Sequence, residues 1–362
     1  MTQTLASPTV DPALVETFAQ RVLTDFAGAA GTALTVIGDR LGLYEAMTEA
    51  GPLTAGELAD RARVNSRLVT EWLAAQTVSG YVTYQPDTQT YELPIEHAMA
   101  LAMVDSPAYL VGAAEVVAGQ YATLEHLQLA FRGDGGVDYQ EFPATTSHGI
   151  ERFFRTAYTH QLAEVWFPRV EGLTEKLTHG ARVAEVGSGH GAATLLMARH
   201  WPRSRFIGFD LDEPSVAVAR SRAREAGGAA NVEFAVSDAA GFGSGPFDVV
   251  MFFDALHDLG DPAAALRRAY DQLTPGGIVV VVEPWSTDRL EDGIGNPVVR
   301  INLAVSTSMC TPTSLAQPGA YGLGTGGGPR RRLELLTDAG FLGAHVAVDT
   351  GQNLVLAAHT AG

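Results

Sequence analysis

Apolar residues recur every three or four positions through the first third of the chain, which is the spacing of amphipathic helices. Residues 11–50 carry this pattern, and the glycine-containing segment 28–31 predicts a break that divides it into two helices. Thr54 and Glu57 lie at the spacing of a capping box, in which each side chain bonds the other residue's free amide. They predict the start of a third helix, and residues 67–79 predict a fourth.

Two short strand-like runs, 81–84 and 91–93, follow these helices and predict a β-hairpin. Helices followed by a hairpin are the plan of a winged helix, and we expect residues 1–100 to form such a domain. Long helical patterns, 104–132 and 149–178, then continue the chain. We therefore expect residues 101–180 to form a helical linker and a lid over the substrate.

The pattern changes after residue 180, where short continuous apolar runs alternate with helix-forming segments. Continuous apolar strands between helices are typical of a parallel sheet covered on both faces, so we expect an α/β domain here. The predicted strands are 183–186, 205–210, 232–235, 247–253 and 278–282, with a turn at 274–277 before the last.

A glycine-rich stretch, Glu185-Val-Gly-Ser-Gly-His-Gly191, connects the first of these strands to a helix. Glycines have no Cβ, so a ligand can approach the backbone, and the amides at the helix start can hold its polar end. The spacing is G-x-G-x-G rather than the G-x-G-x-x-G of dinucleotide sites, so a pyrophosphate is not the expected ligand.

Acidic residues end the first three predicted strands, and they are Glu185, Asp210 and Asp238. In open α/β sheets, ligands bind outside the carboxyl ends of the strands, where these side chains meet. Asp210 follows Gly191 by 19 residues and is placed to accept hydrogen bonds from ribose hydroxyls, while Asp238 is placed to accept from an adenine amino group. The three acids together predict an adenosine ligand.

The net charge of the predicted winged helix helps to decide between DNA binding and pairing with a second copy of the chain. The whole chain has a formal charge of -17, and residues 1–100 contain five arginines and twelve acidic residues, giving about -7. A DNA reader neutralises phosphates with Lys and Arg, so a DNA-binding regulator is the least favoured interpretation. Pairing of the apolar helices with a second copy of the chain is favoured, and we expect a homodimer.

Other compositional features restrict the environment and chemistry. The single cysteine, Cys310, excludes an internal disulfide framework and a cysteine metal cluster, and we expect no metal site. The first residues lack the basic region and apolar core of a signal peptide, and no apolar run is long enough to cross a bilayer. We therefore expect a cytoplasmic protein that binds neither membrane nor nucleic acid.

The motifs taken in order resemble those of class I S-adenosylmethionine-dependent methyltransferases. They are Glu185–Gly191, Asp210, Ser237-Asp238, Phe247-Asp-Val-Val250 and Leu273-Thr-Pro-Gly-Gly277. Nearly the whole chain is similar to two-domain bacterial small-molecule methyltransferases, relatives of plant and polyketide O-methyltransferases of secondary metabolism. The resemblance implies a Rossmann-like seven-stranded sheet over residues 181–362, closed by an antiparallel pair at 344–348 and 353–358, with an insertion at 291–330 that completes the substrate pocket.

The resemblance also implies S-adenosylmethionine as cofactor and S-adenosylhomocysteine as product. The cofactor-binding residues that it implies are Glu185, Gly187, Ser188, Gly189, Gly191, Asp210, Leu211, Asp238, Ala239, Phe253 and Asp254. The substrate-binding candidates on the helices that lead to the sheet and in the insertion are Tyr158, Trp166, Asn302 and Met309. These residues predict a mostly apolar cavity for a small acceptor.

The chemistry expected from this family is methyl transfer to a hydroxyl or phenol, with His257 as the base. Asp258 is its neighbour and Glu283 matches an acidic partner, which would raise the pKa of the imidazole and fix its tautomer. The family's second acidic partner has no match, because residues 326–333 offer arginines instead. N-, C- or carboxyl-methylation by proximity, including a peptide acceptor, therefore stays open. So do a structural role for His257 and a cofactor-binding protein with another activity or none.

Overall fold

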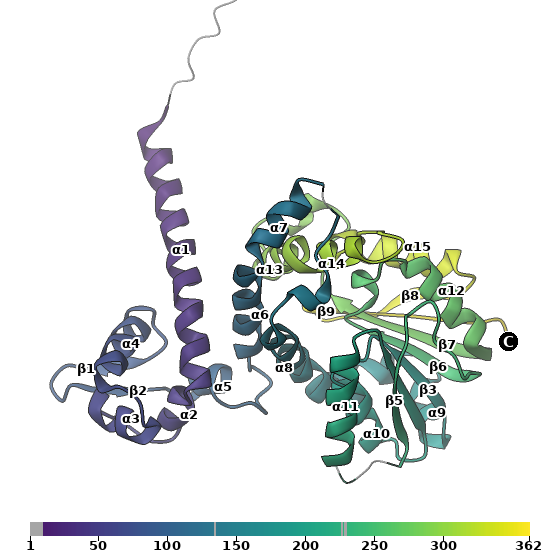
Figure 1. Ribbon diagram of the computed structural model, residues 1–362, viewed down its shortest axis with the longest axis horizontal. Coiled ribbons are helices and arrows are strands. Elements are labelled where there is room, and N and C mark those ends of the chain that lie inside the picture. Colours follow the sequence, from purple (N-terminus) through teal and green to yellow (C-terminus); the bar gives the residue numbers. More distant parts are fainter. Residues whose placement is uncertain (1–9, 134, 226, 228–229) are drawn as a thin grey trace, which may run out of the picture. The chain divides into compact units, whose positions relative to one another are not determined.

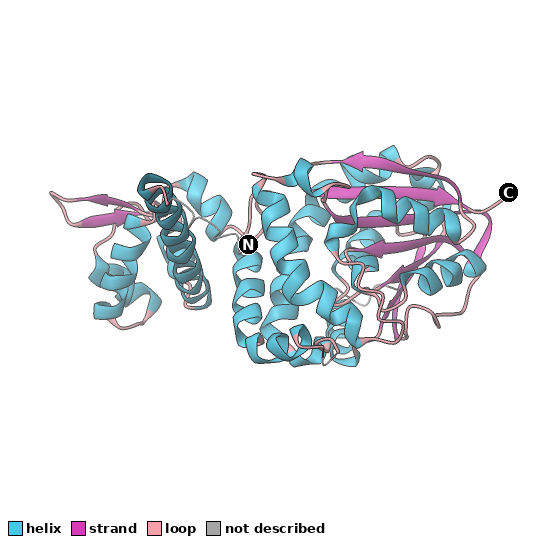
Figure 2. Ribbon diagram, turned by 90° about the horizontal axis from the view of Figure 1, so that it is seen from above, coloured by secondary structure: helices cyan, strands magenta, loops and turns pink. Residues whose placement is uncertain are grey.

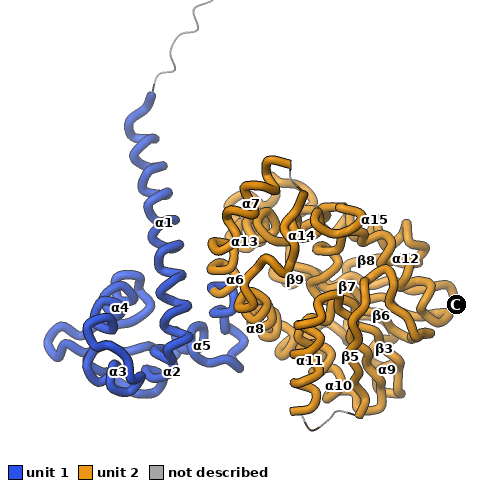
Figure 3. Tube along the Cα trace, in the orientation of Figure 1, with its two compact units in different colours: residues 1–114 blue, residues 115–362 orange. Residues whose placement is uncertain are grey.

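The computed structural model describes residues 10–133, 135–225, 227 and 230–362. The chain divides into two compact units, Met1–Ala114 and Glu115–Gly362, and each is described by itself (Figure 3). The boundary lies within helix α6 (Val111–Ala122), so most of the segment expected as linker and lid belongs to the second unit. Among the described residues, no helix combines the length and apolar character that crossing a bilayer requires.

The first unit is a helical domain with a two-stranded hairpin. Its elements are α1 (Pro12–Arg40), α2 (Leu43–Met47), α3 (Ala55–Ala62), α4 (Ser66–Val78), β1 (Thr83–Gln85), β2 (Thr90–Glu92) and α5 (Ile95–Leu101). The capping box is confirmed, since Thr54 accepts from the Glu57 amide and the Glu57 carboxylate accepts from the Thr54 amide. A core that includes Tyr44, Leu58 and Trp72 joins α2, α3 and α4.

The break predicted at residues 28–31 is wrong, because α1 runs through it without interruption. Each glycine in a helix interior costs about 1 kcal/mol relative to alanine, which weakens a helix but does not end it. No proline lies in this segment, so every backbone hydrogen bond can form. Thr32 and Thr35 also donate their hydroxyls to the carbonyl groups of Gly28 and Gly31.

The second unit is built on a seven-stranded sheet, as predicted. The strands are β3 (Arg182–Val186), β4 (Arg205–Asp210), β5 (Val232–Val236), β6 (Phe247–Phe253), β7 (Leu273–Pro284), β8 (Leu342–Asp349) and β9 (Asn353–His359). Their order is β5-β4-β3-β6-β7-β9-β8, and β9 runs antiparallel to both of its neighbours (Figure 1). The chain therefore reverses its winding at β3, which places a crevice at the carboxyl ends of β3 and β6.

Helices cover both faces of this sheet, as the colouring by secondary structure shows (Figure 2). Alternate residues of each central strand enter two separate cores. Val183 and Val249 belong to one core, whereas their neighbours Ala184 and Val250 belong to the other. The covering helices are α9 (Leu173–His179), α10 (Ala192–His200), α11 (Glu213–Glu225), α12 (Pro262–Gln272) and α15 (Gly328–Asp338).

Further helices lie beside the carboxyl edge of the sheet. They are α6, α7 (Leu124–Phe131), α8 (Ala144–Gln161), α13 (Pro297–Val305) and α14 (Thr311–Ala316), with π-helical turns at Leu162–Trp166 and Ser306–Cys310. The helix expected over 104–132 is divided near Thr123, and the one expected over 149–178 ends before Pro168. Proline lacks an amide proton and therefore interrupts the helical hydrogen bonds at residue 168. The prediction from apolar spacing did not take this into account.

The turn expected at 274–277 is instead part of β7. Phe247 pairs with Leu273 and Val249 pairs with Ile278, so the strand bulges out and returns to register. Gly276 adopts a positive φ of 68° in this bulge. Pro275 and the two glycines after it correctly predicted an irregular backbone here. They did not predict that β7 pairs with β6 both before and after the bulge.

Candidate functional site

The glycine loop makes a tight turn in which two of the three glycine positions leave no room for a side chain. Gly187, Gly189 and Gly191 have φ values of 78°, 49° and 78°, which favour glycine. A Cβ on Gly187 would lie 2.4 Å from the Ala255 side chain, and one on Gly191 would lie 2.6 Å from the Phe234 ring. The loop is therefore held against its neighbours with its backbone exposed to the crevice.

The acids at the strand ends are engaged with the same loop. Glu185 is 3% exposed and accepts a hydrogen bond from the Thr194 hydroxyl, and burial raises its pKa to about 8. Asp210 accepts from the Gly189 amide at 2.7 Å and from the Asp212 amide at 2.9 Å, while burial raises its pKa. The sequence predicted a ribose contact for Asp210 but not its bond to the loop, which two segments must come together to make.

A cavity of about 620 Å³ opens at this edge of the sheet. Its volume is in the range of small-molecule sites. The predicted residues that line it are Glu185, Gly187, Ser188, Gly189, Asp210, Leu211, Asp238, Ala239, Phe253, Asp254, Tyr158 and Asp258. The structure thus brings together most of the residues expected to bind the cofactor, and those assignments stay predictions.

Other predicted residues lie behind the cavity wall. Gly191 caps α10. Trp166 is fully buried in the core and donates its indole N–H to the side-chain Oε1 of Gln161 at 3.1 Å. Asn302 donates to the Trp285 carbonyl at 2.9 Å, and Met309 packs in a small core beside α7. Of the four predicted substrate residues, the structure places Tyr158 on the cavity wall.

Tyr158 is held in the cavity wall by a hydrogen bond to Asp254, which the sequence pattern did not predict. Its hydroxyl donates to Asp254 Oδ2 at 2.6 Å, linking α8 to the end of β6. Asp254 has a φ of 48°, and its Oδ1 has no hydrogen-bond partner among the described residues. Burial raises the pKa of Asp254 to about 8, despite the hydrogen bond from Tyr158. This carboxyl group is therefore poised to lose a proton to the medium when a cation approaches it.

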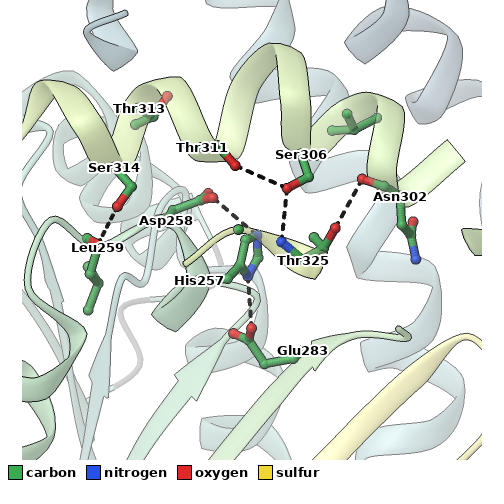
Figure 4. A network of polar contacts seen from close by, with 12 residues as sticks. His257, Asp258, Leu259, Glu283, Asn302, Ser306, Thr311, Thr313, Ser314 and Thr325 are labelled. Carbon is green, nitrogen blue, oxygen red and sulfur yellow. Dashed lines mark hydrogen bonds and ion pairs between the residues drawn. The ribbon is translucent and has the colours of Figure 1, made fainter. Parts of the chain in front are cut away.

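His257 lies in a 3₁₀ turn after β6, between two carboxylates (Figure 4). Its Nδ1 is 3.1 Å from Glu283 Oε2, and its Nε2 is 3.1 Å from Asp258 Oδ1. Burial alone would lower the pKa of His257, but Asp258 and Glu283 raise it well above the ordinary range. The His257 side chain is 3% exposed and the Asp258 side chain 32%, so Asp258 stands between the imidazole and the cavity.

A buried arginine shares the carboxylate of Glu283. Arg332 is 0% exposed, and its Nε donates to Glu283 Oε2 at 2.8 Å, the same oxygen that faces His257. Burial would raise the pKa of Glu283, but His257 and Arg332 together lower it to about 2. From the sequence, the arginines near residue 330 indicated only that the expected acidic partner is missing. The contact between Arg332 and Glu283 was not predicted.

Arg332 also holds the glycine-rich segment that precedes α15. Its guanidinium donates to the carbonyl oxygens of Gly328 at 2.8 Å and Gly324 at 3.2 Å. The Gly324 amide in turn donates to the His257 carbonyl at 3.1 Å. The segment around Gly324 is therefore tied to the turn that carries His257.

One group in the described residues has the composition of a metal site. His257, Asp258 and Cys310 each bring a ligand atom within 4.8 Å of the others. Burial raises the pKa of the Cys310 thiol to about 12. The imidazole and the Asp258 carboxylate form an ion pair with each other.

Comparison with protein families matches both units. Residues 177–309 match a methyltransferase domain, and residues 29–103 match an Rv2258c-like winged HTH domain. The chain carries an S-adenosylmethionine-dependent methyltransferase domain. Its glycine loop, its cavity and the Ser188 Oγ, which has no hydrogen-bond partner among the described residues, fit such a cofactor, since they offer close backbone approach and a polar group to bind it.

Relatives of the methyltransferase domain act on several acceptors. The chain is 30% identical over 107 residues to a ubiquinone biosynthesis O-methyltransferase of Ruegeria pomeroyi, covering 30% of this chain and 42% of that protein. It is 30% identical over 109 residues to a trans-aconitate 2-methyltransferase of Streptomyces avermitilis, covering 30% and 40%. The chain thus spans about two fifths of the length of these curated relatives.

The fold matches a solved structure over its whole length. Human N-acetylserotonin methyltransferase in complex with S-adenosylmethionine has a TM-score of 0.68 at 19% identity, covering 99% of this chain and 100% of that one. At this identity the likeness establishes the fold, including a helical region before the sheet.

Proposed function

We propose that this protein transfers a methyl group from S-adenosylmethionine to a hydroxyl oxygen of a small-molecule acceptor. The observation that carries the proposal is the buried His257 imidazole, which is held between the carboxylate of Glu283 and that of Asp258, a residue that lines the cavity. A hydroxyl must lose its proton as it is methylated, and a group that accepts the proton within hydrogen-bond reach speeds this step.

The glycine loop and the strand-end acids are the residues that would hold the cofactor. When bound, S-adenosylmethionine supplies a methyl group on a sulfonium, which is already activated for displacement. Asp210 and Asp238 are expected to accept from the adenosine, and Glu185 and Asp254 to balance positive charge. The remaining contribution of the protein is alignment of the acceptor in a site closed to water.

Proton removal falls to the His257–Asp258 pair. Asp258 lines the cavity and meets the hydroxyl, while the buried imidazole of His257 stabilises the Asp258 carboxylate and shares its proton. Glu283 fixes the imidazole through Nδ1, and Arg332 keeps Glu283 ionised. An acceptor hydroxyl in the cavity would give its proton to this pair.

Two substitutions test this proposal. His257→Gln and Asp258→Asn should each lower kcat by about 100-fold or more, with the cofactor Kd measured by calorimetry unchanged. His200→Gln, which alters an exposed imidazole on α10, is the matched control and should keep full turnover. Methyl gain by mass spectrometry on a panel of hydroxyl compounds supplies the assay, and undiminished turnover in both variants would remove the pair from the mechanism.

A second candidate is methylation of nitrogen by proximity alone. The burial of His257 behind the cavity wall favours it, because an amine that arrives neutral needs no base. Fragmentation of the methylated product distinguishes the two, since the new methyl group then lies on nitrogen. In that case the Asp258→Asn variant keeps its turnover.

We also propose that a second copy of the chain is the protein partner. Helix α1 carries exposed apolar side chains along its length: Leu14, Val15, Phe18, Leu23 and Phe26. Apolar surface of this extent is unfavourable in water, and a symmetric pairing of two such helices would bury it.

A further inference from the structure

The lining of the cavity is strongly biased in charge. Within the described part of the chain, nine lining residues are Asp or Glu and none is Lys or Arg. His190 is the one histidine in that lining, and burial lowers its pKa, so it adds no positive charge at neutral pH. Any ligand that enters therefore meets a wall of carboxyl groups.

Most of these carboxyl groups lack a cation from the protein. Glu151 pairs with Arg222 at 3.1 Å, and Asp258 pairs with His257. Subtracting these two from nine leaves seven without an ion-pair partner among the described residues. Counting Glu185 and Asp254 as protonated, since the pKa of each is about 8, leaves five formal negative charges, and ionisation of either group beside a cation adds to them.

The cofactor does not cancel this charge. S-adenosylmethionine carries an ammonium, a sulfonium and a carboxylate, so its net charge is about +1 at neutral pH. The cavity with cofactor bound is therefore still negative by several charges when the acceptor arrives. Clefts with low-dielectric walls focus such a field on the ligand.

Two buried polar atoms of the cavity lining also lack a hydrogen-bond donor in the described part of the chain. Asp254 Oδ1 and Thr313 Oγ1 are both buried atoms of lining residues, and neither has a hydrogen-bond partner among the described residues. Thr313 is only 5% exposed. A protonated amine brings three donors and a positive charge, and so satisfies both needs at once.

We infer that the acceptor is a hydroxyl compound that carries a protonated amine, and that the site discriminates against carboxylate-bearing acceptors. The inference rests on the proposed function and names its substrate class. The amine lies away from the reacting oxygen, because a protonated nitrogen has no lone pair with which to accept a methyl group.

Matched acceptors that differ only in charge test the inference. On one phenol scaffold, substituents of aminoethyl, ethyl and carboxymethyl type should give kcat/KM in that order, with roughly tenfold or more between the first and last. Raising the salt concentration should lower the value for the amine and leave that for the neutral phenol unchanged. Any other order, or equal values, overturns the inference while leaving the methyltransferase proposal in place.

A variant of one lining carboxylate sharpens the test. Asp261 caps α12 by accepting from the Ala264 amide at 2.8 Å, and asparagine caps equally well. Asp261→Asn therefore removes a negative charge and keeps the helix cap. It should reduce the preference for amine over carboxylate by roughly threefold. Asp271→Asn, on the same helix but exposed and outside the lining, is the matched control and should leave the preference unchanged.

The failure of the proposed function has a separate signature. If calorimetry shows that S-adenosylmethionine binds, yet mass spectrometry finds no methyl gain on acceptors of any charge, the proposed function fails and the substrate class with it. A preference for the carboxylate acceptor fails the charge inference alone.

Discussion

Single residues set the electrostatics of the cavity, and Glu185 shows how. Its carboxyl group is enclosed at the end of β3 with a hydroxyl donor from Thr194, and no cationic side chain of the described residues forms an ion pair with it. Burial disfavours the charged form, which raises the pKa to about 8. The folded protein thus binds a proton on Glu185 over a pH range in which the unfolded chain has lost it.

The sign of the stability effect follows from this difference. Because the unfolded chain binds fewer protons between pH 4.5 and 8, the free energy of unfolding should fall as pH rises through that window. Glu185→Gln removes the titration while keeping an acceptor for Thr194, so its thermal unfolding temperature should fall less steeply with pH than that of the parent. Glu233→Gln, at an exposed position of β5, is the control. Parallel pH profiles for parent and Glu185→Gln would contradict the assignment.

At the scale of elements, two pairs of segments are joined by buried polar contacts. Tyr158 connects α8 to the loop after β6, and Arg332 connects α15 to the end of β7. Arg332 also binds carbonyl groups of the glycine-rich segment, which is tied to the turn of His257. The position of α15 thereby acts on the imidazole without touching it, and Arg332 is a positioning residue.

Substitution of Arg332 separates this role from a purely structural one. Arg332→Met should destabilise the fold by about 3–5 kcal/mol, because it leaves a buried carboxylate with one partner fewer. Loss of a cation also raises the pKa of His257 further, so the acidic limb of the kcat profile should move up by about one pH unit. Arg332→Lys should recover part of the shift.

Arg331→Met is the control for that experiment. Arg331 is the exposed neighbour of Arg332 and pairs with Glu334 on the surface, so its loss should leave both stability and the pH profile nearly unchanged. A loss of stability in Arg332→Met with an unmoved pH profile would assign the residue to packing alone.

At the scale of the molecule, the first unit supplies apolar surface rather than positive charge. Residues 1–100 have a formal charge of about -7, and α1 exposes Leu14, Phe18 and Phe26. Surface of this kind favours association with protein and opposes association with the phosphate backbone of nucleic acid. A homodimer through α1 is the assembly that these observations support.

Light scattering tests the dimer. Phe18→Glu combined with Phe26→Glu should convert a dimer to a monomer at micromolar concentration, because burying a carboxylate opposes pairing. Gln20→Glu adds a charge at an exposed polar position of the same helix without removing apolar area, and it should leave the mass unchanged. A monomeric parent protein at that concentration would refute the proposal.

Local patterns in the sequence determined the strands, the glycine loop and the acids at the strand ends. Burial on both faces forces each central strand to be continuously apolar, and the turn into α10 requires positive φ values at Gly187, Gly189 and Gly191, which favour glycine. These requirements act within a few residues of one another, so they are visible in the order of residues. The two strands that close the sheet came instead from the family resemblance, which the structure confirms.

Only the tertiary structure decided which polar groups meet. Tyr158 and Asp254 are 96 residues apart, and Glu283 and Arg332 are 49 apart, so no local period relates either pair. The 3₁₀ turn after β6 likewise sends His257 inward and its neighbour Asp258 to the cavity. Packing of α8 and α15 against the sheet fixes these contacts, because a buried charge is stable only where another element brings its partner.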